Sequence, residues 1–267
     1  MSEIASAFDH GKAFAAFVTC GDPDLGTTAE VVRSLAANGA DLIELGIPFS
    51  DPTAEGPVIQ AANERALSAG TTTDKVFDMV AEVRRDVSIP MVFMTYANVV
   101  FSYGTERFLD RCVDIGIQGI ILPDVPYEEK ADFEPQCAER GLALVSMVAP
   151  TSESRISMIA SEARGFVYVV SSLGVTGVRS SITTDVGAMT SLIRQATDVP
   201  CAIGFGISTP EQARAMAVHA DGIIIGSAIV KMLAQHGKAA PGPVGEYARS
   251  IKAAISGLRR QSISTEW

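Results

Sequence analysis

Residues 201–228 read CAIGFGISTPEQARAMAVHADGIIIGSA, and they hold two apolar runs with a segment of helical periodicity between them. The runs CAIGFG (201–206) and GIIIGSA (222–228) have the length and composition of buried β-strands. The segment TPEQARAMAVHA opens on a threonine with an acidic residue close behind, which is a helix start signal. A strand, a helix and a second strand in this order predict parallel strands joined by a right-handed crossover.

The same unit recurs along the chain. Six earlier apolar runs are AFAAFVTC (13–20), DLIELG (41–46), PMVFMTY (90–96), GIILP (119–123), ALVSMVAP (143–150) and FVYVVS (166–171). Eight strands, each followed by a helix, are the count of a closed (β/α)8 TIM barrel, and we predict this α/β fold. An open doubly wound sheet would need a Gly-rich turn after its first strand, which TCGDPD does not supply. No linker rich in Pro, Gly or charge interrupts the chain, so we expect residues 1–267 to form a single domain.

Three segments fall outside the eightfold repeat. Residues 2–9 (SEIASAFD) predict a short helix that plugs the N-terminal mouth of the barrel. The long stretch after the second strand predicts an extra helical turn around 58–68, and residues 238–258 predict a final helix after the eighth strand. The polar tail at about 259–267 is expected to be frayed.

Composition narrows the classes of function. Hydrophobic residues make up 47% of the chain and charged residues 19%, as expected for a parallel sheet buried on both faces. No apolar stretch approaches the roughly 18 residues of a membrane span, and the N-terminus lacks the pattern of a signal peptide, so we expect a cytoplasmic protein. The net charge of −10 argues against nucleic acid and anionic membranes as partners.

The cysteines and histidines predict neither a metal site nor a His-centred triad. The four cysteines are scattered without a C-x-x-C pair, and we interpret them as small hydrophobic residues in a reducing compartment. The three histidines have no neighbour at metal-ligand spacing.

Carboxylates stand where the second strand ends. In a TIM barrel the active site lies at the C-terminal ends of the strands, and Glu44 is predicted at that rim above apolar neighbours. Partial desolvation there would raise its pKa, so that it holds a proton near neutral pH. The following loop, IPFSDPTAEGP (47–57), adds Asp51 and Glu55, and two carboxylates in different surroundings can divide acid and base roles. The alternative is structural: Glu44 caps a strand or pairs with an arginine, and the loop acids are solvated.

Glycines follow the last three strands. GVTG (174–177), IGFGIS (203–208) and GSAIVK (226–231) place backbone N–H groups where TIM barrels bind phosphate, although tight turns alone would also explain them. No lysine falls at a strand end to form a Schiff base, and no His/Asp/Glu cluster supports a metal-dependent aldolase. The remaining interpretation of these residues is acid–base chemistry on a phosphorylated substrate, without a cofactor.

Over roughly residues 13–235 the sequence resembles the α subunit of tryptophan synthase. The resemblance rests on FVTCGDP, GADLIELGIPFSDP, GPVIQAANERAL, MTYANVVFSYG, LPDVPYEE, VYVVSSLGVTGVR, GFGISTPEQ and GSAIVK. It implies retro-aldol cleavage of indole-3-glycerol phosphate to indole and glyceraldehyde 3-phosphate, without a cofactor in this chain.

The resemblance also implies roles for the two carboxylates. Glu44 matches the catalytic glutamate, which protonates C3 of the indole and removes the proton of the glycerol hydroxyl. Glu55 matches the second carboxylate, which accepts a hydrogen bond from the indole N–H. The family more often has Asp at this position, in A-D-G-P, whereas this chain reads AEGP. The extra methylene moves the carboxylate by about 1.5 Å, and a contact with the ring depends on such distances.

Further positions follow from the same resemblance. Substrate contacts are expected at Phe17, Met94, Tyr96, Ile121, Tyr168, Thr176, Phe205 and Ile224. The phosphate is expected at Gly177, Gly206, Gly226 and Ser227. A face with Pro48, Asp51, Asn98 and Pro126 is expected to dock on the β subunit in an αββα complex, in which indole passes to a pyridoxal-phosphate site on the partner.

Three alternatives to this interpretation are open. The chain could be a stand-alone indole-3-glycerol phosphate lyase that releases indole without a β partner. It could be another barrel enzyme on a small sugar phosphate, such as an isomerase, although ELGIPFSDP would then be unexplained. It could also be a non-catalytic subunit that binds and activates a partner.

Overall fold

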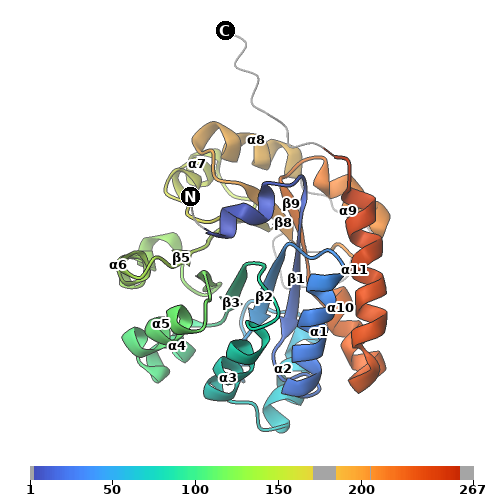
Figure 1. Ribbon diagram of the computed structural model, residues 1–267. Helices are drawn as coiled ribbons and strands as arrows, with labels where there is room; N and C mark the ends of the chain where they lie inside the picture. Colours follow the sequence, from blue (N-terminus) through green and yellow to red (C-terminus); the bar gives the residue numbers. More distant parts are fainter. Residues whose placement is uncertain (1–2, 171–184, 205, 259–267) are drawn as a thin grey trace.

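A ring of parallel strands forms the centre of the chain, with helices around the outside (Figure 1). The computed structural model describes residues 3–170, 185–204 and 206–258. The strands are β1 (Ala13–Thr19), β2 (Leu42–Gly46), β3 (Met91–Met94), β4 (Gly119–Ile121), β5 (Ala143–Leu144), β6 (Ser146–Val148), β7 (Val167–Val170), β8 (Cys201–Gly204) and β9 (Gly222–Ile225). All of their ladders are parallel, as the alternation of strands and helices predicts.

The barrel closes through a strand that is split in two. The sheet order of the described residues is β5-β4-β3-β2-β1-β9-β8-β7-β6, so β5 and β6 stand at opposite ends. They are nevertheless consecutive in the chain, separated only by Val145. The first half pairs with β4 and the second half pairs with β7. The nine strands are therefore eight barrel strands, and the predicted (β/α)8 fold is confirmed.

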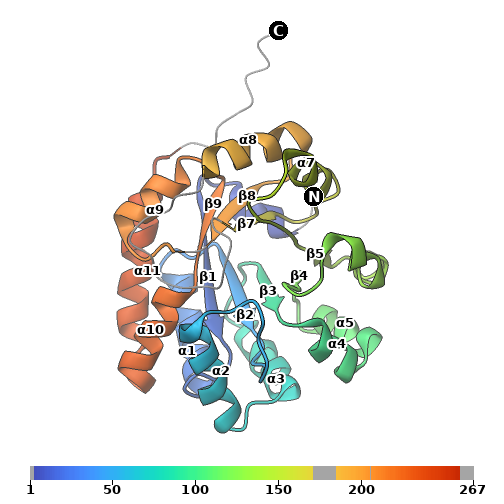
Figure 2. The ribbon, with the colours of Figure 1, turned by 180° about the vertical axis from the view of Figure 1, so that it is seen from behind.

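The helices surround this ring on its outer side, as the two opposite views show (Figures 1 and 2). They are α1 (Leu25–Ala37), α2 (Pro57–Ser68), α3 (Thr73–Val83), α4 (Ala97–Tyr103), α5 (Thr105–Asp114), α6 (Glu134–Glu139), α7 (Glu153–Ser161), α8 (Val186–Ala196), α9 (Pro210–Ala217), α10 (Ser227–His236) and α11 (Pro241–Ile255), with 3-10 turns η1 (Glu3–Phe8), η2 (Tyr127–Asp132) and η3 (Gly237–Ala239). No helix among the described residues is long and apolar enough to cross a membrane.

The extra segments predicted after the second and eighth strands are present. The first is α2, a helix of 12 residues rather than the single turn expected, and the second is α11. Helix α4 was not predicted, because its sequence ANVVFSY continues the apolar run of β3 and lacks a start signal. It ends at Gly104, whose φ of 92° few other residues adopt. The tail at 259–267 lies outside the described residues.

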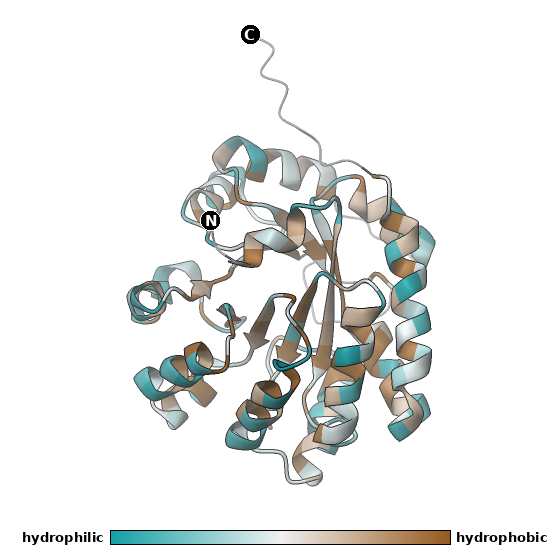
Figure 3. Ribbon diagram, viewed as in Figure 1, coloured by the Kyte–Doolittle hydropathy of each residue, from teal (hydrophilic) through white to brown (hydrophobic). Residues whose placement is uncertain are grey.

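The strands are mostly hydrophobic, as their brown colour in Figure 3 shows, and their side chains alternate between two cores. On β1, Phe14 and Ala16 face the helices, whereas Ala15 and Phe17 belong to a second cluster inside the barrel. Both faces of the sheet are thus buried, which accounts for the apolar composition of the strands.

The N-terminal turn η1 plugs the bottom of the barrel, as predicted. Ile4 and Phe8 are buried, and the Phe8 ring lies 5.9 Å from that of Phe166, which precedes β7. Glycines at the starts of two strands make room for these side chains. A Cβ at Gly119 would lie 3.0 Å from Ile4, and one at Gly222 would lie 3.0 Å from Phe8. The opposite end of the barrel is therefore the one that is left for a site.

An ion pair joins α2 to the loop after β1. The Arg65 guanidinium donates to both carboxylate oxygens of Asp22, at 2.7 and 2.8 Å, and the Asp22 side chain is fully buried. We expect Arg65→Met to lower the free energy of unfolding by roughly 2 kcal/mol, because it leaves a buried carboxylate without its partner. Urea unfolding measures the loss. Lys238→Met, which removes a cation that is 84% exposed, is the matched control, and equal losses in both variants would contradict this account.

Candidate active site

Glu44 lies inside the barrel, in the middle of β2. The ladders pair it with Phe17 of β1 and Val92 of β3. Glu44 as a whole is only 1% exposed to solvent. Among the described residues, neither carboxyl oxygen has a hydrogen-bond partner. Burial, and secondly the charge of Glu55, raise the pKa of Glu44 to about 8. At neutral pH this carboxyl therefore holds a proton and has no hydrogen-bond acceptor for it in the described part of the chain.

Glu55 is the second buried carboxylate, and the loop before α2 carries it. The Asn63 amide donates to its Oε2 at 2.7 Å, and the Tyr96 hydroxyl also donates to the carboxylate. Gln60 donates to the Glu55 carbonyl at 2.8 Å. Burial raises the pKa of Glu55 to about 7, against the opposing effect of the Asn63 and Tyr96 hydrogen bonds. Glu55 is thus a positioned group that ionises near neutral pH.

The two carboxyls act on each other. The charge of Glu55 is one of the two causes that raise the pKa of Glu44, so ionisation of Glu55 favours the proton on Glu44. Their surroundings differ, because Glu55 accepts hydrogen bonds, whereas Glu44 accepts none from the residues that the structure describes. The hydrogen-bonded carboxyl, Glu55, therefore has the lower pKa of the two and loses its proton first.

Glycines make room for two aromatic rings beside Glu44. A Cβ at Gly46 would lie 2.7 Å from the Phe17 ring, and one at Gly226 would lie 3.1 Å from it. Tyr168 of β7 is buried, and burial followed by the Glu44 charge raises the pKa of its phenol. Its hydroxyl lies 2.7 Å from where a Cβ of Gly204 would stand.

Substitution of Gly204 tests this packing. We expect Gly204→Val to force the Tyr168 ring off its position beside Glu44 and to destabilise the fold by roughly 1–3 kcal/mol. Thermal unfolding and cleavage assays measure both effects. A second change, Tyr168→Leu, is expected to recover part of the lost stability by removing the ring. Additive losses in the double variant would contradict the proposed clash.

The predicted ring-contact residues converge on the barrel interior. Phe17, Met94, Ile121, Tyr168 and Ile224 belong to the cluster inside the barrel, and Tyr96 is buried at the start of α4. Thr176, Gly177 and Phe205 lie outside the described residues.

The described part of the predicted phosphate site lies at the ends of β8 and β9. Gly206 and Ser227 are half-buried, and α10 begins at Ser227 with Gly226 before it and no side chain capping the end. The first N–H groups of this helix are therefore not bonded by a capping side chain, and a helix N-terminus of this kind suits an anion.

The predicted partner face is partly exposed. Asp51, Asn98 and Pro126 are exposed, and Pro48 is buried. Among the described residues, no group of three or more His, Cys, Asp or Glu side chains is placed to hold a metal ion.

Asn63 is the functional candidate that the sequence analysis missed. It lies inside the quoted motif GPVIQAANERAL, and it occupies the buried stripe of α2 with Ile59, Ala62 and Ala66. A polar side chain on the apolar face of a predicted helix is the signal that could have identified it.

Comparison with known proteins agrees with this geometry. The family model described as tryptophan synthase alpha chain matches residues 5–254. The chain belongs to the tryptophan synthase alpha chain family. The tryptophan synthase alpha chain of Lacticaseibacillus casei is 46% identical over 263 residues, covering 98% of this chain and 99% of that protein.

Solved structures support the same family. The tryptophan synthase alpha chain of Legionella pneumophila superposes with a TM-score of 0.86 at 33% identity, covering 96% of this chain and 97% of that one. A chain of the tryptophan synthase complex from Pyrococcus furiosus superposes with a TM-score of 0.83 at 31% identity, covering 91% and 99%. The resemblance noted in the sequence is confirmed, and with it the lyase activity of tryptophan synthase alpha chains, the cleavage of indole-3-glycerol phosphate.

Proposed function

We propose that Glu44 is the proton carrier of this lyase and that Glu55 orients and stabilises the indole ring. The observation that carries the proposal is the Glu44 carboxyl, which is 1% exposed, has a pKa of about 8, and has two oxygens without a described partner. A buried acid of this kind lowers the stability of the fold. A role as proton donor, with a pKa near the working pH, explains why the chain carries it.

The reaction needs an electron sink at the indole. Glu44 donates its proton to C3 of the ring, and the ring nitrogen takes the positive charge. The ionised Glu44 then accepts the proton of the glycerol hydroxyl as the carbon–carbon bond breaks. The bonding electrons return to the ring, which leaves as indole, and the hydroxyl carbon becomes the aldehyde of glyceraldehyde 3-phosphate. Glu44 ends the cycle protonated, so the reaction consumes neither a proton nor a cofactor.

Glu55 stabilises the charge on the ring nitrogen. Its carboxylate, held by Asn63 at 2.7 Å and by Tyr96, would accept a hydrogen bond from the indole N–H. A positioned anion at the developing positive charge lowers the barrier without reorganisation. The phosphate of the substrate would bind the N-terminal end of α10 at Gly226 and Ser227, with Gly206 after β8 as a further contact. Gly177, which the sequence assigns to the same phosphate, lies outside the described residues.

The partner in this proposal is a tryptophan synthase β subunit. It would dock on the face with Pro48, Asp51, Asn98 and Pro126, in an αββα assembly that passes indole to pyridoxal phosphate on the partner. The solved Pyrococcus furiosus relative, which is a chain of a tryptophan synthase complex, supports such a partner.

Release of indole tests the proposed function. The purified chain is assayed on indole-3-glycerol phosphate with and without a tryptophan synthase β subunit. We expect slow release that rises strongly with the partner. Fast release that the partner does not change would favour a stand-alone lyase. No release under either condition would refute the catalytic assignment.

Asn63 is expected to act through Glu55. Asn63→Leu removes a hydrogen bond that lowers the pKa of Glu55, so this pKa should rise and the rate near pH 7 should fall roughly tenfold. The pH–rate profile and the separate values of kcat and KM are the readouts. Gln60→Leu, which removes only the bond to the Glu55 carbonyl, is the control. An unshifted profile in Asn63→Leu would contradict this role.

A further inference from the structure

Helix α11 has no role in the proposed reaction, although it packs on the helices that follow both segments assigned to the phosphate. It lies outside the eightfold repeat of strands and helices. It contacts α1, α9 and α10, and Figures 1 and 2 show it beside these helices on the outer side of the barrel. Helix α10 begins at Ser227, and α9 follows the loop after β8 that carries Gly206. The last helix is therefore placed to support the phosphate site from outside the barrel.

Hydrogen bonds and close packing fix the backbone of α11. The Ser34 hydroxyl of α1 donates to the Pro241 carbonyl at 2.6 Å, at the start of the helix. The Arg214 guanidinium of α9 donates to the Ala254 carbonyl at 3.1 Å, near its end. Between these points, a Cβ at Gly245 would lie 2.4 Å from the Ser34 hydroxyl, so α11 lies close against α1. A side chain in the middle of α11 therefore extends from a rigid element.

Tyr247 joins α11 to the loop after β8, of which residues 206–209 are described. Its hydroxyl donates to the Ser208 carbonyl at 3.0 Å, and its ring packs against the hydrophobic core. Burial raises the pKa of the phenol, so the hydroxyl stays a hydrogen-bond donor at the pH of an enzyme assay. The tyrosine thus bonds a backbone group of this loop from a helix 39 residues further along the chain.

Gln212 holds the same loop residue through its other backbone group. The side-chain oxygen of Gln212 accepts from the N–H of Ser208 at 2.9 Å and from its hydroxyl at 3.0 Å. It also accepts from the N–H of Thr209 at 3.3 Å, and Thr209 caps α9. The N–H and the carbonyl of Ser208 are therefore both bonded, one by the helix that follows the loop and the other by α11.

Ser208 stands two positions after Gly206, and the backbone of that glycine needs support. Gly206 has a φ of 79°, and a glycine leaves such a conformation at little cost. Before it, the loop is tied at Gly204, which pairs with Val170 in the ladder of β7 and β8. A loop that is fixed on both sides of its glycine loses less freedom when a ligand binds, so its N–H groups are preorganised for an anion.

We propose that Tyr247 is a positioning residue for the substrate phosphate, and that it acts through the Ser208 carbonyl on the loop that carries Gly206. This inference rests on the proposed function, which places the phosphate at that loop and at the start of α10. Without the hydroxyl, Ser208 would lose one of its two backbone ties, and the loop would have to be ordered by the ligand itself. The role of the last helix is thus to hold the phosphate loop in its binding conformation.

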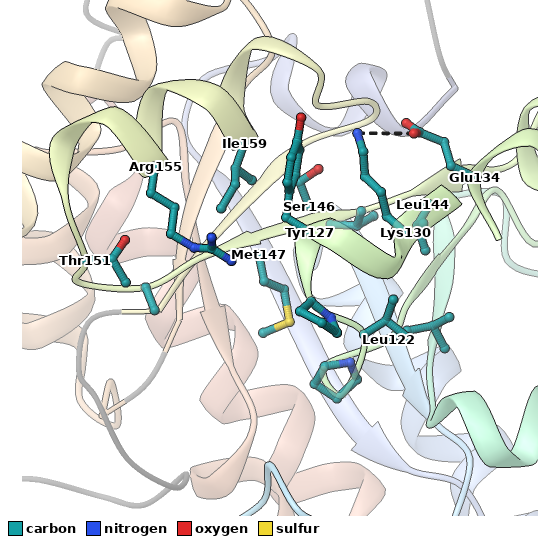
Figure 4. A pocket seen from close by; sticks show the side chains of 15 residues that line it. Leu122, Tyr127, Lys130, Glu134, Leu144, Ser146, Met147, Thr151, Arg155 and Ile159 are labelled. Atoms are coloured by element: carbon teal, nitrogen blue, oxygen red, sulfur yellow. Dashed lines mark ion pairs between the residues drawn. The ribbon is translucent and has the colours of Figure 1, made fainter. Parts of the chain in front are cut away.

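The ring of the substrate would bind a different part of the barrel. A hollow of about 220 Å³ beside β5 and β6 is lined by Leu122, Val145 and Met147 among others, and Met147 points into it in Figure 4. Val145 belongs to the cluster inside the barrel, and Met147 packs against that cluster. None of the described residues that line this hollow belongs to α11 or to the loop after β8. Loss of the Tyr247 hydroxyl should therefore weaken binding of the phosphate and leave binding of the ring unchanged.

Tyr247→Phe tests the proposal in the full chain, because it removes the hydroxyl and keeps the ring. NMR titrations compare glycerol 3-phosphate, which carries the phosphate without the indole ring, with indole, which carries the ring alone. We expect the affinity for glycerol 3-phosphate to fall roughly three- to fivefold, as for the loss of one hydrogen bond, and that for indole to stay unchanged. With the β subunit present, KM for indole-3-glycerol phosphate should rise by a similar factor, while kcat changes less than about twofold.

Tyr103→Phe is the matched control. The Tyr103 hydroxyl of α4 also donates one hydrogen bond, to the exposed Asp74 side chain, and its loss should change neither affinity. Equal affinities of the wild type and Tyr247→Phe for glycerol 3-phosphate would refute the positioning role, even if the variant melts at a lower temperature. An equal loss of affinity for indole would refute it too. Glycerol 3-phosphate binds without being cleaved, so a wild type that binds it but releases no indole would refute the proposed function alone.

Discussion

Glu44→Gln is expected to reduce cleavage of indole-3-glycerol phosphate by about 10³-fold or more while the fold stays intact. General acid–base groups contribute roughly 10² to 10⁴ to a rate, and here one carboxyl serves as both acid and base. Glutamine has the same shape but neither donates nor accepts the proton. Single-turnover assays at saturating substrate, with the β subunit present, measure the loss. A loss below tenfold would show that the proton comes from another group.

The same substitution is expected to stabilise the chain at neutral pH. The pKa of Glu44 rises from an ordinary 4.5 to about 8 on folding, so the folded state keeps a proton that the unfolded state releases between these values. Stability therefore falls as the pH rises through this window. At pH 7 glutamine should remove a cost of roughly 3 kcal/mol, and the dependence that remains up to about pH 7 should be that of Glu55.

Chemical unfolding at pH 5 and pH 8 measures this effect in both proteins. The wild type should lose stability over the interval, and Glu44→Gln should lose markedly less. Parallel pH dependences would contradict the raised pKa of Glu44.

Glu55→Gln is expected to lower turnover ten- to a hundredfold, because an amide lacks the charge that stabilises the protonated indole. It should also lower the pKa of Glu44, since the charge of Glu55 is one cause of its elevation. The falling limb of the pH–rate profile should therefore move to lower pH. Glu64→Gln, on the exposed side of α2, is the control and should leave the profile unchanged. Near-unchanged turnover in Glu55→Gln would place the role elsewhere.

Glu55→Asp tests the length of the side chain at this position, because it keeps the carboxylate charge and removes one methylene. The family more often carries aspartate here, yet in this chain the shorter side chain would withdraw the carboxylate by about 1.5 Å from the Asn63 amide, now at 2.7 Å. We expect turnover to fall severalfold despite the retained charge. Turnover equal to or above that of the wild type would show that Glu55 is not matched to Asn63.

Much of the fold was predictable because each strand and helix carries its own local signal. Apolar runs of strand length and Thr or Ser helix starts recur through the chain, and eight such units specify a closed barrel. Helix α4 was not predicted, because its apolar residues continue the run of β3 and no capping residue marks its start. The split of one strand at Val145 was not predicted either. It arises because β5 pairs with β4 and β6 pairs with β7, and the periodicity along a single strand carries no information about its neighbours.

The site was predictable to the level of residue type and strand, although Glu44 lies in the middle of β2 and not at the strand end that the sequence predicted. Glu44 stands out as an acid within an apolar run, and its burial follows from the barrel register. The partners of Glu55 did not follow from the sequence, because Asn63 lies eight residues further along and reaches the carboxylate only once α2 has formed. The contacts of η2 with α7 and the residue after it likewise did not follow from the sequence, because they join residues 27 and 32 positions apart.

Infrared titration of the Glu44 carboxyl tests the central claim most directly. Difference spectra of the ¹³C-glutamate-labelled chain, wild type minus Glu44→Gln, isolate the carbonyl band of a protonated carboxyl and the band of a carboxylate. We predict that Glu44 is protonated at pH 6.5 and loses its proton around pH 8. A carboxylate band for Glu44 already complete at pH 6.5 would contradict the claim that this buried acid carries the proton of the reaction.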